Sequence, residues 1–92
     1  MDHHKNRGKV LVNYKKAKSL LENVAGMTER GEYCVDIMTQ NLALMGLLRS
    51  AHQMLMEDHL NSCFRSAMEG GSAKKKQQMI DEILVVTKLN NK

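Results

Sequence analysis

Three side chains that can bind a soft metal ion stand out in this sequence of 92 residues: Cys34, His59 and Cys63. His59 and Cys63 are four residues apart, so in a helix they project from one face about one turn apart. A thiolate and an imidazole in that relation form half of a metal site. The same spacing also occurs where a buried structural cysteine lies near an ordinary surface histidine. The pair alone therefore does not decide between a metal site and a structural pair.

Cys34 lies 25 residues before His59 and 29 before Cys63. At about 100° per residue, an uninterrupted helix places all three on one stripe, but 25 residues of helix extend over roughly 37 Å. Cys34 therefore cannot meet His59 within one chain. It can meet both residues of an antiparallel copy, if two chains pair about a two-fold axis near residues 47–48. The stripe between the ligands is mostly suited to a helix contact: Met38, Asn41, Met45, Leu48, His52 and Met56.

Two thiolates and one imidazole suit Cu(I), and they would accept Zn(II) if a fourth ligand were added. Oxygen ligands do not occur at a matching spacing, which argues against Mg²⁺ or Ca²⁺. His3 and His4 offer such a fourth ligand, although a histidine pair at a chain end is also typical of an unstructured tail. The sequence has no set of nucleophile, base and orienting group, so we do not expect an enzyme.

The elements that must carry these residues are predicted to be helices. The sequence has no Pro, 3% aromatic residues and eight Met, a composition that favours helix over sheet. Glycines divide it into three segments of about 6–27, 33–67 and 73–89. The first shows apolar residues at helical spacing, namely Val10, Tyr14, Ala17, Leu21 and Val24. We therefore predict one domain over residues 1–92, a long helical hairpin plus a short third helix, with a flexible N-terminus of about residues 1–6.

The second segment would be roughly 50 Å long as a helix, too long for so small a chain to cover alone. A long amphipathic helix in a small protein usually pairs with copies of itself, so we expect oligomerisation. No apolar run approaches the roughly 18 residues that a membrane span needs, and the charged N-terminus lacks the apolar stretch of a signal peptide. We expect a cytoplasmic protein without a membrane partner.

Fourteen Lys and Arg against ten Asp and Glu give a net charge of +4, which makes a polyanion partner possible. A solvated helix face explains these charges equally well. No helix-turn-helix, zinc-finger or aromatic-platform signature identifies residues that read bases. The plausible phosphate contacts are Lys9, Lys15, Lys16, Lys18 and Arg49.

Two segments around the candidate ligands resemble the copper-sensing operon repressor family, which also includes nickel/cobalt, persulfide and formaldehyde sensors. They are YCVDIMTQ at 33–40 and EDHLNSC at 57–63. The resemblance covers essentially the whole chain, and the Cys-x24-His-x3-Cys spacing is that of the copper-sensing branch. It implies an all-helical dimer of hairpins, a four-helix bundle usually doubled to a tetramer. It also implies Cu(I) held by Cys34 of one protomer with His59 and Cys63 of the other, in a repressor that leaves operator DNA when metal binds.

The resemblance assigns roles to two further residues, Tyr33 and Glu82, which in the family form hydrogen bonds around the ligand histidine. Spacing alone would make Glu82 a solvated helix charge. The sequence departs from the family where Glu22 and Met45 stand at positions that are commonly basic. Three alternatives therefore remain open: a thiol or persulfide sensor of the same fold, a nickel/cobalt sensor, and a copper-buffering helical oligomer that does not bind DNA.

Overall fold

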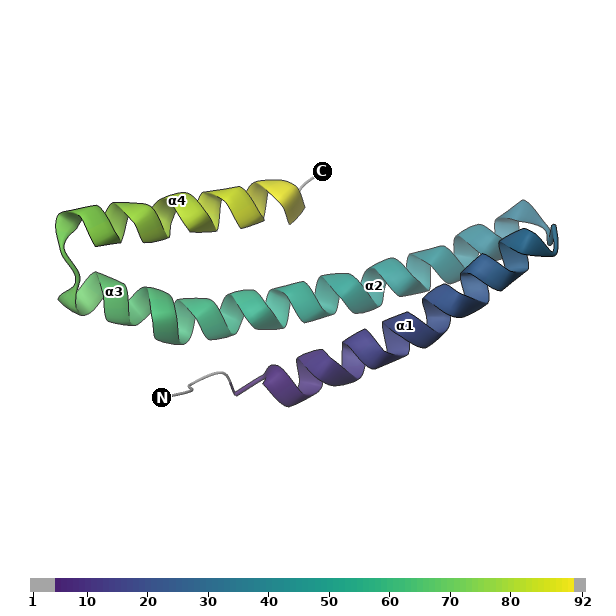
Figure 1. The fold of residues 1–92 in the computed structure, drawn as a ribbon, viewed down its shortest axis with the longest axis horizontal. Helices are drawn as coiled ribbons and strands as arrows, with labels where there is room; N and C mark the ends of the chain where they lie inside the picture. The colour runs from purple at the N-terminus through teal and green to yellow at the C-terminus, as the bar shows by residue number, and fades with distance from the viewer. Residues whose placement is uncertain (1–4, 91–92) are drawn as a thin grey trace. The chain divides into compact units, whose positions relative to one another are not determined.

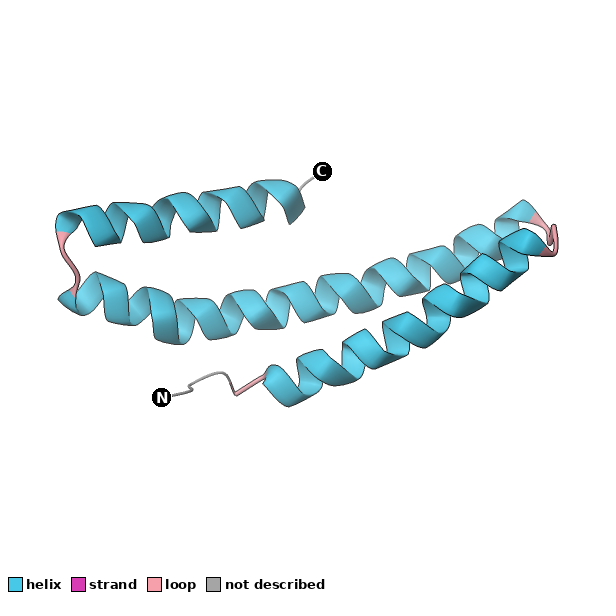
Figure 2. Cartoon of the chain, in the orientation of Figure 1, coloured by secondary structure: helices cyan, strands magenta, loops and turns pink. Residues whose placement is uncertain are grey.

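A computed structural model of the protein describes residues 5–90, and in that part of the chain every regular element is a helix (Figures 1 and 2). The elements are α1 (Arg7–Glu29), α2 (Cys34–His59), η1 (Leu60–Phe64), α3 (Arg65–Gly70) and α4 (Ala73–Asn90). Since α2, η1 and α3 follow one another without a break, they form the long second helix expected from the sequence. The all-helical protomer with a long hairpin and a short last helix is confirmed. The π-helical turn η1 was not expected.

The described chain forms two compact units, one of residues 5–55 and one that begins at Met56. The first contains α1 and most of α2, and the second contains the end of α2 with η1, α3 and α4. Among the described residues, no helix is both long enough and apolar enough to cross a membrane. The single domain of residues 1–92 stays a prediction.

The turn after α1 determines where α2 begins. Gly31 adopts a φ of 69°, the left-handed conformation that only glycine adopts without strain. Its N–H donates to the Thr28 carbonyl at 3.1 Å, and the Glu32 N–H donates to the Met27 carbonyl at 3.1 Å. This pair of bonds is the Schellman motif, which satisfies carbonyls left open at a helix end. The chain therefore reverses within four residues, and α2 starts at Cys34.

α1 and α2 present matching stripes with the alternating three- and four-residue spacing of a coiled-coil seam. Each residue of both stripes is buried or half-buried. The stripe on α1 consists of Asn6, Val10, Asn13, Ala17, Leu20, Val24 and Met27. The stripe on α2 consists of Ile37, Gln40, Leu44, Leu47, Ala51 and Met54. We call these two rows the hairpin seam.

Two asparagines define the register of this seam. The Asn13 Nδ2 donates to the Leu47 carbonyl at 3.2 Å, and the Asn6 Nδ2 donates to the Met54 carbonyl at a longer 3.4 Å. The donors are seven residues apart on α1 and the acceptors are seven apart on α2, in the opposite direction. Both bonds thus report one antiparallel register, in which polar side chains on α1 contact the backbone of α2.

The structure corrects two details predicted for the first helix. Tyr14 and Leu21 were expected on its inner face, but 43% and 55% of their surfaces are exposed. They flank the hairpin seam instead, because the polar residues Asn6 and Asn13 occupy two of its positions. Asn6 is buried and is the N-cap of α1; the flexible N-terminus of about residues 1–6 stays a prediction.

The predicted break between the second and third helices lies at Gly71 and Ser72. The Ser72 Oγ accepts a hydrogen bond from the Lys75 N–H at 3.1 Å, so Ser72 is the N-cap of α4. A Cβ atom added to Gly71 would lie 2.5 Å from the Ala67 carbonyl oxygen. The chain can therefore turn this closely after α3 only because residue 71 is glycine.

On α4, the more buried residues follow a spacing of three and four. They are Lys76, Met79, Ile83 and Val86, of which Met79 is buried and the others half-buried. The neighbouring apolar residues Ile80 and Leu84 are exposed, at 38% and 61%. The buried stripe of α4 is therefore narrow and leaves apolar side chains outside it.

Candidate metal centre

Cys34 is the first residue of α2. The Tyr33 carbonyl accepts hydrogen bonds from the N–H groups of Asp36 at 3.0 Å and Ile37 at 3.2 Å, so Tyr33 is at the N-cap position of α2. The Cys34 side chain is exposed. The first candidate ligand is therefore accessible from solvent at the start of α2.

His59 and Cys63 lie at the other end of the same helix. His59 is the last residue of α2 and is half-buried, whereas Cys63 belongs to η1 and is exposed. A π-turn replaces the usual bond between residues i and i+4 with one between i and i+5. An α-helix throughout would put all three ligands on one stripe, but the π-turn rotates Cys63 away from the position that an α-helix would give it.

A buried serine lies between the two ligands of this end. The Ser62 Oγ donates a short hydrogen bond of 2.6 Å to the Asp58 carbonyl and lies 3.8 Å from the Cys63 Sγ. Ser62 is 8% exposed and Asp58 is 2% exposed. Ser62 could not be recognised from the sequence, because a serine in a helical pattern gives no signal that distinguishes a buried hydroxyl from a solvated one.

The structure brings His59 and Cys63 to consecutive turns, while Cys34 stands at the opposite end of α2. Within residues 5–90, no three His, Cys, Asp or Glu side chains converge in a way that could hold a metal ion. A three-ligand site that combines two protomers stays a prediction. His3 and His4, the possible fourth ligands, lie outside the described residues.

Tyr33 and Glu82 were expected to form hydrogen bonds around the ligand histidine. Both side chains are exposed, Tyr33 at 69%. Within the part of the chain that the structure describes, neither makes a hydrogen bond to His59. Their contact with the ligand histidine stays a prediction for the assembled protein.

The first part of the stripe between Cys34 and His59 is exposed on the first unit, whereas His52 and Met56 further along it are half-buried. Met38, Met45 and Leu48 are 56%, 47% and 43% exposed, and Asn41 is exposed as well. At about 100° per residue, this stripe lies roughly 110° around α2 from the hairpin seam. α1 therefore covers one apolar face of α2 and leaves the part of a second face from Met38 to Leu48 exposed. We call this second face the ligand stripe.

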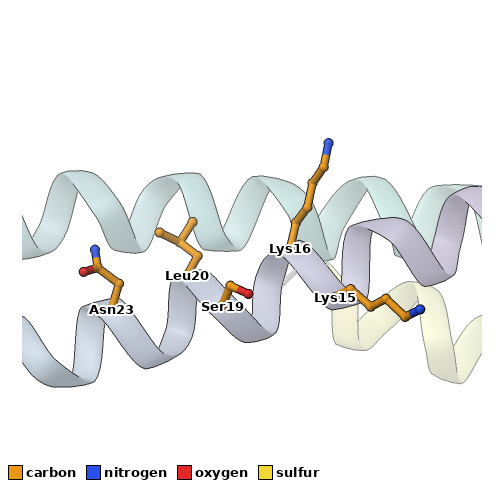
Figure 3. Close-up of a pocket in the computed structure, with 5 residues that line it drawn as sticks. All are labelled: Lys15, Lys16, Ser19, Leu20 and Asn23. Carbon is orange, nitrogen blue, oxygen red and sulfur yellow. The ribbon is translucent and has the colours of Figure 1, made fainter.

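The five basic residues predicted to contact DNA are all exposed, but they do not form one cluster. On α1, Lys9 and Lys16 are seven residues apart and share one side, whereas Lys15 and Lys18 share another. In Figure 3, Lys15 and Lys16 point away from each other. They border a shallow depression of about 540 Å³, lined also by Ser19, Leu20 and Asn23.

The chain matches the family described as metal-sensitive transcriptional repressor over residues 6–88. It belongs to that family. Family members are regulators of transcription rather than enzymes, and they respond to metal and act on DNA.

Named relatives agree with this assignment. The copper-sensing transcriptional repressor CsoR of Mycobacterium ulcerans is 34% identical over 74 residues, which cover 80% of this chain and 61% of the relative. CsoR of Bacillus subtilis is 29% identical over 84 residues, or 91% of this chain and 80% of the relative. The copper-sensing repressor RicR of Mycobacterium tuberculosis is 34% identical over 58 residues, 62% of this chain and 60% of the relative. The chain thus spans about three fifths of the mycobacterial repressors it matches. No solved structure matches it.

Proposed function

We propose that this protein is a Cu(I)-responsive repressor, which binds operator DNA when metal-free and releases it when Cu(I) binds. One observation carries the proposal. Two exposed thiols and one half-buried imidazole lie near the two ends of the long second helix, and the ligand stripe between them is exposed from Met38 to Leu48. The donor set suits Cu(I) in its soft, low-coordinate chemistry, and family members with similar sequences are named copper-sensing repressors.

The ligand stripe supports an assembly of two chains. An exposed apolar row along a helix marks an interaction surface in a water-soluble protein. Two ligand stripes that pair antiparallel would bury their methionines and bring Cys34 of each chain to His59 and Cys63 of the other. We propose a dimer that is a four-helix bundle, doubled to a tetramer, and working in the cytoplasm.

Cu(I) can change DNA binding only if it binds the DNA-incompetent arrangement more tightly than the DNA-competent one. The three ligands come from both chains of the proposed dimer, so their distance depends on how the chains are arranged. Tyr33 and Glu82 would orient the His59 ring through hydrogen bonds, a support that ligand histidines usually have. The metal would supply bonds that join the two chains, and the protein would supply the difference in ligand distances between the DNA-competent and DNA-incompetent arrangements.

Mixed dimers test whether the site is shared between chains. Cys34→Ala chains and His59→Ala/Cys63→Ala chains should each bind no Cu(I) at the three-ligand site. A mixed dimer of the two should regain one of its two sites, since one chain keeps Cys34 and the other keeps His59 and Cys63. Copper titration against a chelator of known affinity measures the recovery. Mixed dimers that form and still bind no copper would exclude a shared site.

The basic residues of α1 offer a matched test of the DNA surface. Lys9→Ala/Lys16→Ala and Lys15→Ala/Lys18→Ala each remove two charges from the same helix, but from different sides. If phosphate contacts dominate, the pair that faces DNA should weaken binding to every sequence and lower the salt dependence by about two counterions. Cu(I) stoichiometry should remain unchanged in both. Equal losses of affinity from both pairs would indicate a general electrostatic attraction rather than a contact surface. Arg49→Ala tests in the same way whether α2 contributes to the contact.

The exposure of both thiols also suits a second function, a thiol or persulfide sensor in which Cys34 of one chain is linked to Cys63 of the other. Such a sensor needs two accessible thiols and no imidazole. His59→Ala separates the two functions. It should abolish the release of DNA by Cu(I), while two thiolates still hold the metal. In a thiol sensor, polysulfide would release DNA from His59→Ala as well as from the wild type.

A further inference from the structure

The ligand stripe carries two polar side chains between its candidate ligands, Asn41 and His52. His52 is half-buried, and its ring nitrogen Nε2 is enclosed without a hydrogen-bond partner among residues 5–90. A buried polar group without a hydrogen bond is costly, so nearly all such groups in folded proteins have a partner. We therefore expect the assembled protein to provide a partner for His52 that the single chain lacks.

Asn41 can provide this partner, but only from another chain. Its side chain is exposed, and its Nδ2 lies 3.7 Å from the Met45 Sδ, a weak acceptor. The amide can donate to the bare nitrogen of an imidazole or accept from its N–H. A histidine ring can turn over about its last torsion, which exchanges Nε2 with a ring carbon. Asn41 and His52 are eleven residues apart in α2, roughly 16 Å along the axis, so they cannot meet within one helix.

The spacing of this pair matches that of the candidate ligands. Where two identical helices pair antiparallel, the numbers of the residues that meet have a constant sum. This sum is 93 for Cys34 with His59, and it is also 93 for Asn41 with His52. All four residues lie in α2, before the π-turn begins. The two-fold axis that brings Cys34 to His59 of a second copy therefore also brings Asn41 to His52 of that copy.

We infer that Asn41 forms a hydrogen bond with His52 of a second copy of this chain, twice per dimer, and that this pair fixes the register of the antiparallel interface. The inference rests on the dimer of the proposed function, but not on its metal. The stripe between the two residues is apolar, with Met45 and Leu48, and such side chains pack in more than one register. A buried polar pair selects a single register, because any other leaves its polar groups without partners.

A double-mutant cycle in the metal-free, full-length protein tests the pair. His52→Leu, Asn41→Leu and the double variant are compared by the dissociation constant of the dimer, measured by sedimentation. Each single variant should dissociate about tenfold more readily or more, because the remaining polar group is buried without a partner. The double variant should stay within about threefold of the wild type, since replacing both partners by apolar groups is nearly neutral. His52→Gln, which keeps a hydrogen-bonding side chain, should also resemble the wild type.

Gln53 provides the matched control. It is exposed and follows His52 in α2, but it lies on another side of the helix. The effects of Gln53→Leu and Asn41→Leu should therefore add, as they do for residues that do not touch. Since Asn41 and His52 are too far apart to touch within one chain, a non-additive effect of their variants reports a contact between chains.

Cu(I) binding tests whether the pair also sets the register. The double variant should form dimers but bind Cu(I) more weakly than the wild type in a chelator competition. If its dimers occupy the ligand-sharing register only about one tenth of the time, the apparent affinity falls about tenfold. Equal Cu(I) affinity of the double variant and the wild type would overturn the role of the pair in the register.

The outcomes separate this inference from the proposed function. If the effects of His52→Leu and Asn41→Leu simply add, the pair does not form and the inference is wrong, whether or not the protein binds copper. If the two effects are coupled but the wild type takes up no Cu(I), the proposed function fails and the contact between chains stands. A folded wild-type monomer at micromolar concentration would overturn both.

Discussion

The hydrogen bond between Asn13 and the Leu47 carbonyl should make a measurable contribution to the stability of the hairpin. Asn13 is half-buried and its Nδ2 reaches the carbonyl at 3.2 Å. A typical intramolecular hydrogen bond contributes about 1 kcal/mol net. Leu47 lies inside α2, where its carbonyl also accepts a helical bond. Removing the asparagine therefore leaves no buried acceptor without a donor, and the loss should be close to the net value of one bond.

Asn23 provides the matched control on the same helix. Its Nδ2 contacts the Met27 Sδ at 3.5 Å within α1 and makes no bond to α2. Replacing asparagine with alanine in a helix gains up to about 0.7 kcal/mol of helix propensity, and this gain applies to both positions. Asn13→Ala should therefore be less stable than Asn23→Ala by about 1 kcal/mol, the value of the interhelix bond alone.

Urea unfolding followed by circular dichroism measures this difference. With an m-value of about 1 kcal/mol/M, the midpoint of Asn13→Ala should lie about 1 M below that of Asn23→Ala. All proteins must be compared at one concentration, because association would shift the apparent stability. A difference below about 0.3 kcal/mol, a fraction of one hydrogen bond, would refute the conclusion that Asn13 links α1 to α2.

Three further predictions follow from the turns and the exposed faces. Gly71→Ala should cost about 1–3 kcal/mol because its Cβ meets the Ala67 carbonyl, whereas Gly70→Ala, with nothing within 4 Å, should be neutral or stabilising in thermal melts. Gly31→Ala should lower the free energy of unfolding by about 1–2 kcal/mol, because an L-residue resists a φ of 69°. Its melting temperature should therefore lie below that of Gly70→Ala. Light scattering should show a dimer or tetramer of the reduced protein, since Met38 remains exposed on one chain; a folded monomer of 10.4 kDa would exclude the shared site.

The extents of the helices were predictable from the sequence, because the breaks depend on local chemistry. Gly31 ends α1 and Gly71 precedes α4, and both have clear conformational reasons. The inner face of α1 was less predictable. The side chain of Tyr14 suggests a core residue and that of Asn13 a solvent-exposed one. In the structure Tyr14 is exposed and Asn13 is half-buried. A buried asparagine that bonds to a neighbouring helix cannot be distinguished from a surface asparagine by its sequence pattern.

The candidate ligands were found from spacing, but the geometry around them was not. The interval from Cys34 to His59 follows α-helical rotation, so its stripe could be calculated. The four residues from His59 to Cys63 include a π-turn, in which the buried Ser62 hydroxyl donates to the Asp58 carbonyl. No residue type in this stretch specifies a π-turn. Sequence therefore predicts which residues are candidate ligands, while the structure shows the local geometry around two of them.

The two faces of α2 together imply that metal binding and assembly are linked. α1 covers the hairpin seam, so the ligand stripe is the face left for a second chain, and it is also the face that carries Cys34 and His59. If the ligands come from two chains, only the assembled protein binds Cu(I) with all three. A ligand that binds one state alone stabilises that state by RT ln(1 + [L]/Kd), about 2.7 kcal/mol at 100 times Kd. Because the proposed dimer has two such sites, Cu(I) should then favour it about 100-fold per site, or about 10⁴-fold in total, over separate chains. Subunit exchange between differently labelled proteins should slow on copper addition, but exchange of the Cys34→Ala protein should not, because its shared site lacks a thiolate.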